Sequence, residues 1–342
     1  MSAITPMNAM PTRRLGPFQV SAIGFGCMNF SHGYGQQMTV AQARPVIEAA
    51  LQSGTTLFDT AMLYGNGHNE TLLSEILVAG HRDQIVLCSK GGMVAEQGPD
   101  GYRRRIDSKP QTIVQNCHDS LQRLKTDVLD LYYLHRWDKV TPIEEVVGAM
   151  GRLVEQGKVR TVGLSEVSAA TLKKAHAVHP ITAVQSEYSL WTRNPEIGVL
   201  QACEQLGVQL VAFSPVGRGF LTDSFAGVQG LANDDLRQKM PRFLPPAVDH
   251  NRMIVAGLQA KAKLLGMTTA QLALAWLVQK SPSIIPIPGT TSAAHASENA
   301  AAAHWSLSPA DWQTIDQLIG QHNVMGGRYD EAAQAGVDTE NF

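Results

Sequence analysis

The sequence predicts an α/β protein: a (β/α)8 barrel of the TIM type, with an N-terminal β-hairpin and a C-terminal helical extension and tail. Eight short apolar, β-rich runs alternate with helical patterns along nearly the whole chain, which is typical of a parallel sheet. The runs are continuously apolar, as expected for strands covered on both faces. A Rossmann domain is disfavoured because Gly24-Phe25-Gly26 and Gly217-Arg218-Gly219 both lack the third glycine of a Gly-x-Gly-x-x-Gly motif.

The eight strands are predicted in chain order from these runs. They fall at residues 22–26, 56–59, 85–90, 129–135, 159–164, 183–185, 208–213 and 284–288. Before the first strand, residues 13–20 centre on Leu15-Gly16-Pro17-Phe18, a hairpin-like turn that we expect to plug the bottom of the barrel. After the seventh strand, residues 217–246 form a long irregular connection, and such loops often act as lids or ligand clamps.

Residues that typically begin or end helices lie between the predicted strands. Thr39 is placed to cap a helix over residues 40–53, which Gly54 stops. Pro142 lies in the first turn of a helix ending at Gly157. Pro195 is predicted to open a helix that ends at Gly207, and Ser168 or Thr171 to begin a short helix before Pro180.

Composition narrows the class of protein. With 342 residues and a formal net charge of −2, the chain gives no electrostatic reason to bind nucleic acid or an anionic membrane. No secretory signal and no apolar run of about 18 residues are visible. The four cysteines form no Cys-x-x-Cys pair, so reduced core thiols in a cytoplasmic protein are expected. The basic run at residues 103–105 is interpreted as a solvated loop.

We expect a single domain over residues 1–342, with a flexible N-terminus at residues 1–11. No linker divides the chain. Whether the protein forms a homo-oligomer is left open by the sequence.

Polar residues recur where the predicted strands end. Asp59, Lys90 and His135 each close an apolar run, and Tyr64 follows Asp59 by five residues. Taken singly, each has an ordinary explanation: a turn aspartate, a rim lysine, a core histidine, and a tyrosine before a turn. In a parallel barrel, however, the carboxyl ends of all strands meet at one face, where catalytic groups lie.

These four side chains suit the reduction of a carbonyl. A tyrosine holds its proton at neutral pH, and a neighbouring ammonium should lower its pKa. A carboxylate beside the lysine keeps the ammonium charged despite burial, and a neutral imidazole can donate to the substrate oxygen. Side chains supply no hydride, so a nicotinamide cofactor is expected.

Several motifs resemble those of the aldo-keto reductases. They comprise residues 54–65 with Asn69-Glu70, Ser89-Lys90, residues 132–136, residues 157–165 and residues 213–219. Residues 176–185 and 189–193 resemble the branch that includes perakine reductase and pyridoxal reductase-like enzymes. His176 and His179 lie inside that motif, which favours a structural role over metal binding.

The resemblance implies a role for each matching residue. Tyr64 would be the general acid, Lys90 and Asp59 would tune it, and His135 would orient the carbonyl. NADPH would lie extended over the barrel mouth. Ser165 and Gln185 would hold the carboxamide, and Phe213 would stack on the nicotinamide in place of a frequent tyrosine. The remaining cofactor contacts would come from Met28, Asp59, Ser214, Pro215, Val216, Gly217, Arg218, Gly219, Gly289, Thr290, Thr291, His295, Glu298 and Asn299.

Two departures from the family pattern affect the cofactor site. Residues 291–297 contain no permanent cation, where relatives usually carry Lys or Arg, so NADH stays an alternative to NADPH. Thr290, Ser292 and a protonatable His295 would compensate in part. Glu166 stands where many relatives have Asn, and we expect it to add negative charge near the carboxamide.

The substrate is expected to be a small, uncharged aldehyde or ketone. The pocket wall is predicted from Met28, Tyr34, Trp137, Trp191 and the tail around Arg328-Tyr329. Two other functions remain open: a non-catalytic regulatory subunit like the potassium-channel β-subunits, which share the fold and cofactor site, and an aldolase-like enzyme with Lys90 as a Schiff-base lysine.

Overall fold

The computed structural model describes residues 10–98, 101–225 and 227–342. Most of the N-terminal segment that we expect to be flexible, residues 1–9, lies outside these ranges. Of the rest of that segment, Pro11 accepts a hydrogen bond through its carbonyl from Ala22 N at 2.7 Å. The prediction of a single domain over residues 1–342 stays a prediction.

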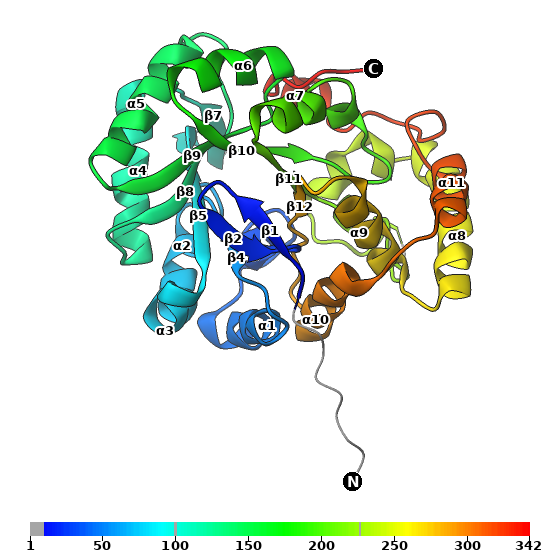
Figure 1. Cartoon of the computed structure of the whole chain (residues 1–342). Coiled ribbons are helices and arrows are strands. Elements are labelled where there is room, and N and C mark those ends of the chain that lie inside the picture. The colour runs from blue at the N-terminus through cyan, green and yellow to red at the C-terminus, as the bar shows by residue number, and fades with distance from the viewer. Residues whose placement is uncertain (1–9, 99–100, 226) are drawn as a thin grey trace.

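The chain begins with the predicted hairpin. Strands β1 (Thr12–Leu15) and β2 (Phe18–Ser21) pair antiparallel around a turn at Gly16. Gly16 has φ of +56°, and a Cβ there would lie 2.8 Å from Thr182 Cγ2, so the turn requires glycine. The buried side chains of Leu15 and Val20 pack against strand residues such as Val86 and Val211. The hairpin therefore closes one end of the barrel, toward the viewer in Figure 1.

Eight parallel strands form the barrel, which confirms the predicted fold. In sheet order they are β3 (Phe25–Gly26), β4 (Leu57–Asp59), β5 (Val86–Gly91), β8 (Leu129–Leu134), β9 (Val159–Ser165), β10 (Ile181–Glu187), β11 (Gln209–Phe213) and β12 (Ile284–Pro286). The ring is closed between its first and last strands by two hydrogen bonds. Gly24 N donates to Pro286 O at 2.9 Å, and Gly26 N donates to Pro288 O at 3.2 Å.

Helices surround the strands, as Figure 1 shows. They are α1 (Val40–Gln52), α2 (His68–Leu73), α3 (Ala79–His81), α4 (Pro110–Leu124), α5 (Ile143–Glu155), α6 (Ala169–Val178), α7 (Val199–Leu206), α8 (Ala247–Leu265), α9 (Thr269–Lys280), α10 (Ala293–Ala301), α11 (Pro309–Leu318) and α12 (Glu331–Ala335). Thr39 caps α1 and Ser168 caps α6, as the sequence predicts. Pro195 instead lies in a 3-10 turn, and α7 begins later, at Val199.

A second hairpin, β6 (Met93–Gly98) and β7 (Gly101–Ile106), extends beyond β5. The basic run at residues 103–105 was expected to be a loop, and that expectation is wrong because these residues pair with β6. Pairing satisfies their backbone groups, which a solvated loop would leave to water. The chain enters the hairpin through Gly92, which has φ of +85°.

The connection from β11 to α8 packs an aromatic cluster. The Trp191 ring lies tilted against the Phe220 ring with centroids 4.6 Å apart and packs edge-to-face with Phe243 at 5.7 Å. Trp191 was predicted to line the substrate pocket, but it is 2% exposed in this cluster. A large apolar ring gains more from core burial than from a position on a cleft wall.

The C-terminal tail runs back over the barrel and binds α6. Asp338 Oδ2 accepts hydrogen bonds from Ser168 N at 3.1 Å and from Thr171 Oγ1 at 2.7 Å. Glu340 Oε1 accepts one from Ala169 N at 2.7 Å. Two carboxylates thus lie at a helix N-terminus, where negative charge is favoured, and they fix the tail in place.

Two expectations from composition can be compared with the structure. The four cysteines are free and buried, as predicted. In the described ranges, none of the helices combines the length and apolar character that a bilayer crossing requires.

Candidate active site

A large cleft of about 1400 Å³ opens at the carboxyl ends of the strands. Asp59, Tyr64 and His135 line it, and Lys90 lies just beneath, 1% exposed. Strands β4, β5 and β8 carry three of these residues at or next to their final positions. The four side chains therefore converge, as parallel strands predict.

Lys90 links the group. Its Nζ donates to Asp59 Oδ1, to Thr60 O at 2.9 Å and to the Tyr64 hydroxyl at 3.1 Å. Asp59 Oδ2 also accepts from Gln185 Nε2 at 2.8 Å. All three donors of the ammonium are satisfied, so its position is fixed.

A buried amide supports this arrangement from below. Asn69 Oδ1 accepts from Thr60 Oγ1 at 2.6 Å, and Asn69 Nδ2 donates to Cys27 O at 2.9 Å. Because the carbonyl of Thr60 accepts from Lys90, Asn69 helps to hold the lysine in place.

Lys90 stays charged despite its burial. Burial lowers its pKa, but the Asp59 carboxylate and Tyr64 outweigh that effect, and the net pKa is raised. Burial also raises the pKa of Asp59, against the opposing effects of Lys90 and Gln185. The ion pair itself keeps both groups in their charged forms.

The pKa of Tyr64 differs from the expectation. The sequence predicts a lowered pKa, but burial raises it and outweighs the opposing Lys90 charge, so the net pKa lies above its usual value. The phenol consequently keeps its proton through neutral pH. That is the form a proton donor requires.

Two histidines flank the Tyr64 ring. The His135 ring meets it edge-on with centroids 5.8 Å apart, and the His32 ring stacks on it at 5.9 Å. Burial, followed by the charges of Lys90 and Arg136, lowers the pKa of His135 well below its usual value. Burial and then Arg104 lower the pKa of His32 to about 4. Both imidazoles are neutral at pH 7. The sequence did not suggest His32, because no strand end marks its position.

Glu166 does not behave as predicted. Its Oε1 accepts from Glu187 N at 2.8 Å, and its Oε2 accepts from Arg328 Nη2 at 2.6 Å. The expected negative charge near the carboxamide is therefore neutralised by an arginine of the C-terminal tail. Glu166 also has φ of +55°, a left-handed conformation that asparagine tolerates better than glutamate.

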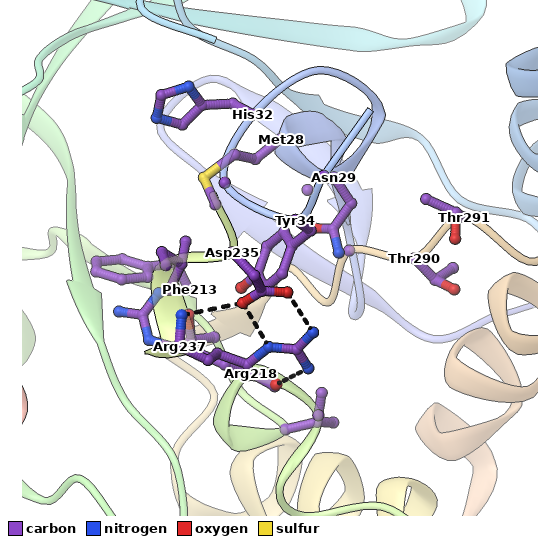
Figure 2. Close-up of a pocket in the computed structure, with 18 of the residues that line it drawn as sticks. Met28, Asn29, His32, Tyr34, Phe213, Arg218, Asp235, Arg237, Thr290 and Thr291 are labelled. Carbon is purple, nitrogen blue, oxygen red and sulfur yellow. Dashed lines mark hydrogen bonds and ion pairs between the residues drawn. The ribbon is translucent and has the colours of Figure 1, made fainter. Parts of the chain in front are cut away.

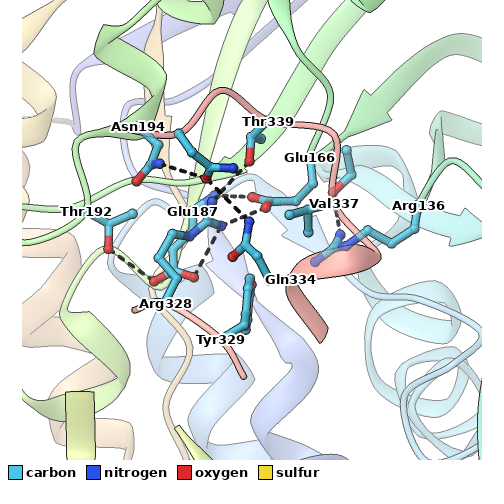
Figure 3. A network of polar contacts seen from close by, with 12 residues as sticks. Arg136, Glu166, Glu187, Thr192, Asn194, Arg328, Tyr329, Gln334, Val337 and Thr339 are labelled. Carbon is cyan, nitrogen blue, oxygen red and sulfur yellow. Dashed lines mark hydrogen bonds and ion pairs between the residues drawn. The ribbon is translucent and has the colours of Figure 1, made fainter. Parts of the chain in front are cut away.

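Glu166 belongs to a buried ion network, shown in Figure 3. Arg328 also lies 3.4 Å from Glu187, and Arg218 Nη2 donates to the same carboxylate at 2.9 Å. Burial would raise the pKa of Glu187, but Arg218 and Arg328 outweigh it and lower that pKa to about 2. Arg328 itself does not line the cleft, but its neighbour Tyr329 does. The network connects the tail to the loop after β11.

Most of the residues predicted to bind the cofactor line the cleft, and Figure 2 shows part of this surface. The lining residues are Met28, Gln185, Phe213, Ser214, Pro215, Val216, Arg218, Gly219, Gly289, Thr290, Thr291, His295, Glu298 and Asn299. Ser165 and Gly217 do not line it. Ser165 Oγ accepts from Arg136 Nη1 at 3.0 Å just below. Two guanidinium groups lie near the Phe213 ring, with Arg136 Cζ 5.9 Å and Arg218 Cζ 6.0 Å from the ring centroid.

A contact between two loops crosses the cleft. Leu236 N donates to Gly33 O at 3.0 Å, and Arg237 Cζ lies 5.2 Å from the Tyr34 ring centroid. Asp235 holds Arg237 through Nε at 2.9 Å and Nη2 at 2.7 Å, as Figure 2 shows. Tyr34 therefore lines the cleft as predicted, and Asp235 and Arg237 are additions from the irregular connection.

The other predicted wall residue, Trp137, lies elsewhere. Its Nε1 donates to Thr141 O at 2.8 Å, and the ring packs against the core. Together with Trp191 it is absent from the cleft lining.

The residues predicted to contact the adenosine end, Thr290, Thr291, His295, Glu298 and Asn299, are polar and include no Lys or Arg. Ser292 caps α10 by accepting from His295 N at 3.4 Å, and the His295 side chain is exposed. Glu298 accepts from Thr268 Oγ1 at 2.7 Å.

Metal binding finds no support in the described ranges, which contain no group of three or more His, Cys, Asp or Glu side chains suited to a metal ion. His176 Nδ1 accepts a hydrogen bond from Ile181 N at 3.2 Å. This contact fits the structural role expected for it.

Comparisons with known proteins agree on one family. Residues 22–320 match the model of the "Aldo/keto reductase family". A Glycine max protein named "Probable aldo-keto reductase 1" is 40% identical over 315 residues, which cover 91% of this chain and 89% of the relative.

Solved structures of similar proteins give the same result. A glycerol dehydrogenase from Gluconobacter oxydans superposes with a TM-score of 0.82 at 25% identity, covering 90% of this chain and 94% of that one. An aldo-keto reductase from Klebsiella pneumoniae in complex with NADPH superposes with a TM-score of 0.71 at 28% identity, covering 95% and 99%.

Proposed function

The chain belongs to the aldo/keto reductase family, and from that premise we propose that this oxidoreductase reduces aldehydes or ketones to alcohols with NADPH. The single observation that carries the proposal is the Tyr64 hydroxyl, 3.1 Å from the Lys90 ammonium at the floor of a large cleft. A protonated phenol beside a fixed cation is suited to donate its proton to a developing alkoxide.

The roles of the other residues follow from their geometry. Bound nicotinamide cofactor would supply the hydride to the carbonyl carbon. Neutral His135 would donate a hydrogen bond to the carbonyl oxygen and orient it toward Tyr64. Lys90 would stabilise the phenolate left after proton transfer, and Asp59 would keep Lys90 charged.

The cleft residues fit a dinucleotide. The cleft volume of about 1400 Å³ exceeds the volume that a small substrate alone needs. Phe213 would stack on the nicotinamide ring, and Gln185 with Ser165 would hold the carboxamide. Arg218 and the loop around it would meet the pyrophosphate, and Thr290, Thr291, His295, Glu298 and Asn299 would contact the adenosine end.

NADPH is the preferred cofactor in this proposal, with NADH as the alternative. The Klebsiella pneumoniae relative in complex with NADPH supports NADPH as the cofactor. The lack of Lys or Arg between Thr290 and Asn299 favours NADH, because a cation there would pair with the additional phosphate of NADPH.

The alternatives are less consistent with the site. An aldolase-like Lys90 would have to be a free amine, but its contact with Asp59 keeps it protonated and weakly nucleophilic. The four site residues do not by themselves exclude a regulatory subunit, because potassium-channel β-subunits can retain them, and oxidation of the bound cofactor by a panel of carbonyl compounds decides between the two functions. Trapping of a substrate on Lys90 by borohydride would support the aldolase.

The branch, location and assembly of the protein are also proposals. Residues 176–185 and the Ser165-Glu166 pair support a place in the branch of perakine reductase and pyridoxal reductase-like enzymes. A cytoplasmic location and a small carbonyl substrate belong to the same proposal, and a homo-oligomer stays open.

Replacement of the proton donor tests this function directly. Tyr64→Phe should lower kcat for carbonyl reduction by at least about 10²-fold, while NADPH binding, followed by protein fluorescence, changes little. Tyr132→Phe is the matched control, because it removes a hydroxyl that donates to Ile113 O away from the cleft. Near-native turnover by Tyr64→Phe would remove Tyr64 as the acid.

A further inference from the structure

The β6–β7 hairpin turns one of its faces to the proposed catalytic tyrosine. Met93 lies opposite Ile106, and Ala95 lies opposite Arg104. Residues two apart on a strand share a face, so these four side chains project to the same side. Met93 and Ile106 pack in one apolar cluster with Tyr64, and Met93, Ala95 and Arg104 line the cleft.

Neighbouring arginines on this hairpin have different surroundings. Arg105 projects from the outer face, where Glu96 accepts from its Nε at 2.5 Å and Asp107 accepts from its Nη1 at 2.7 Å. Arg104, on the inner face, forms no hydrogen bond or ion pair with the residues that the structure describes. Its charge still reaches the site, because it contributes, after burial, to the lowered pKa of His32.

The pairing register of β6 and β7 determines how far Arg104 lies from Tyr64. The Ala95–Arg104 pair lies two residues along each strand from the Met93–Ile106 pair, which packs with Tyr64. Two residues of a strand span about 7 Å. The arginine side chain is long enough to extend over part of this distance toward Tyr64. A group recognised by Arg104 would therefore lie a few bonds from a carbonyl held by Tyr64 and His135.

Other charged groups near this wall already have partners. Asp330 lines the cleft, but its Oδ1 accepts from Ala333 N at 2.8 Å as the cap of α12. Arg136 donates to His135 O at 2.7 Å and to Ser165 Oγ at 3.0 Å. Arg104 is therefore a cation that the hairpin itself offers to a ligand in the cleft. A single guanidinium matches the single charge and the two oxygens of a carboxylate.

We propose that Arg104 binds the carboxylate of the substrate, and that the preferred substrates are aldehydes or ketones with a carboxylate a few bonds from the carbonyl. This inference rests on the proposed reductase function and replaces the expectation of an uncharged substrate. It makes Arg104 a residue that determines specificity.

The test compares two aldehydes that differ in charge. The wild-type protein with NADPH is assayed on 4-carboxybenzaldehyde and on its uncharged methyl ester, whose aldehyde is somewhat more electrophilic, so that intrinsic reactivity does not favour the acid. We expect a higher kcat/KM for the acid. Arg104→Met should lower the acid-to-ester ratio roughly 10- to 100-fold, mainly through KM, and raising the ionic strength should lower the wild-type ratio.

Control variants separate recognition of the carboxylate from general damage. Arg105→Gln removes a cation from the outer face of the same hairpin and should leave the ratio unchanged. Arg104→Glu should lower the ratio further than Arg104→Met, because it repels the carboxylate.

The possible results lead to different conclusions. An acid-to-ester ratio that is the same in wild type, Arg104→Met and Arg105→Gln would overturn the role of Arg104, and so would an equal loss on both aldehydes. If the wild type reduces neither of these aldehydes nor any of a panel of other carbonyl compounds, the proposed reductase function itself fails.

Discussion

Arg328 Nη2 lies 2.6 Å from Glu166 Oε2, and the two residues are separated by 162 positions in the chain. Both side chains are almost completely buried. Glu166, which directly follows β9 beside the proposed carboxamide site, is thus held by the C-terminal tail, and loss of either partner would leave a buried charge.

Arg328→Met should destabilise the fold strongly. Removing one partner of a buried ion pair costs about 3–5 kcal/mol, because the remaining charge stays desolvated. The free energy of unfolding from urea denaturation measures the loss. The double variant Glu166→Asn/Arg328→Met should recover part of it, since asparagine is uncharged and accepts the left-handed backbone at position 166. No recovery in the double variant would contradict this account.

The pH dependence of reduction should report Tyr64. Because burial raises its pKa, the phenol stays protonated through neutral pH, and kcat should fall only in the alkaline range. Lys90→Met removes a charge that lowers this pKa, so the alkaline fall should move to still higher pH. The plateau rate should drop about 10²–10⁴-fold, because the phenol releases its proton less readily. An alkaline fall at the same pH as in the wild type would show that the charge of Lys90 does not act on Tyr64.

Stability below neutral pH should depend on His135. Its pKa in the folded protein lies well below its usual value, whereas an unfolded histidine takes up a proton near pH 6.5. Between these two values the unfolded chain binds more protons, so the free energy of unfolding decreases as the pH falls. His135→Gln should make this decrease shallower between pH 7 and 5 in denaturation experiments. His304→Gln, at an exposed position outside the cleft lining, is the control and should change the slope less.

Coenzyme preference should respond to a cation at position 295. His295→Arg places a permanent charge at the proposed adenosine end, where a charge-assisted hydrogen bond of about 1.5–3 kcal/mol corresponds to a gain of roughly ten- to a hundredfold in NADPH preference. The ratio of kcat/KM for NADPH and NADH measures it, and His304→Arg makes the same change outside the cleft. An unchanged ratio in His295→Arg would show that this segment does not meet the phosphate.

The convergence of Asp59, Lys90 and His135 could be predicted because each ends a strand, and parallel strands bring their ends together. Tyr64 and the proposed cofactor-binding residues 213–219 were predicted from motifs. These predictions needed only local sequence, since the strand positions were clear from apolar runs.

Other features required tertiary information. The contact between Glu166 and Arg328 joins distant segments, so nothing near either residue announces it. Trp191 could not be assigned between cleft and core, because the same ring suits both until Phe220 and Phe243 are placed around it. The different surroundings of Arg104 and Arg105 depend on strand pairing that the sequence alone did not suggest.

The junction between the first and last strands of the barrel has fewer interstrand hydrogen bonds than the central strand pairs have. At the seam, Gly24 and Gly26 donate to Pro286 and Pro288, and neither proline has an amide hydrogen to return the bond. We therefore expect the two glycine amides to exchange with deuterium earlier than those of the central strands, and new chain ends engineered at this junction to be tolerated better than ends cut elsewhere in the cylinder.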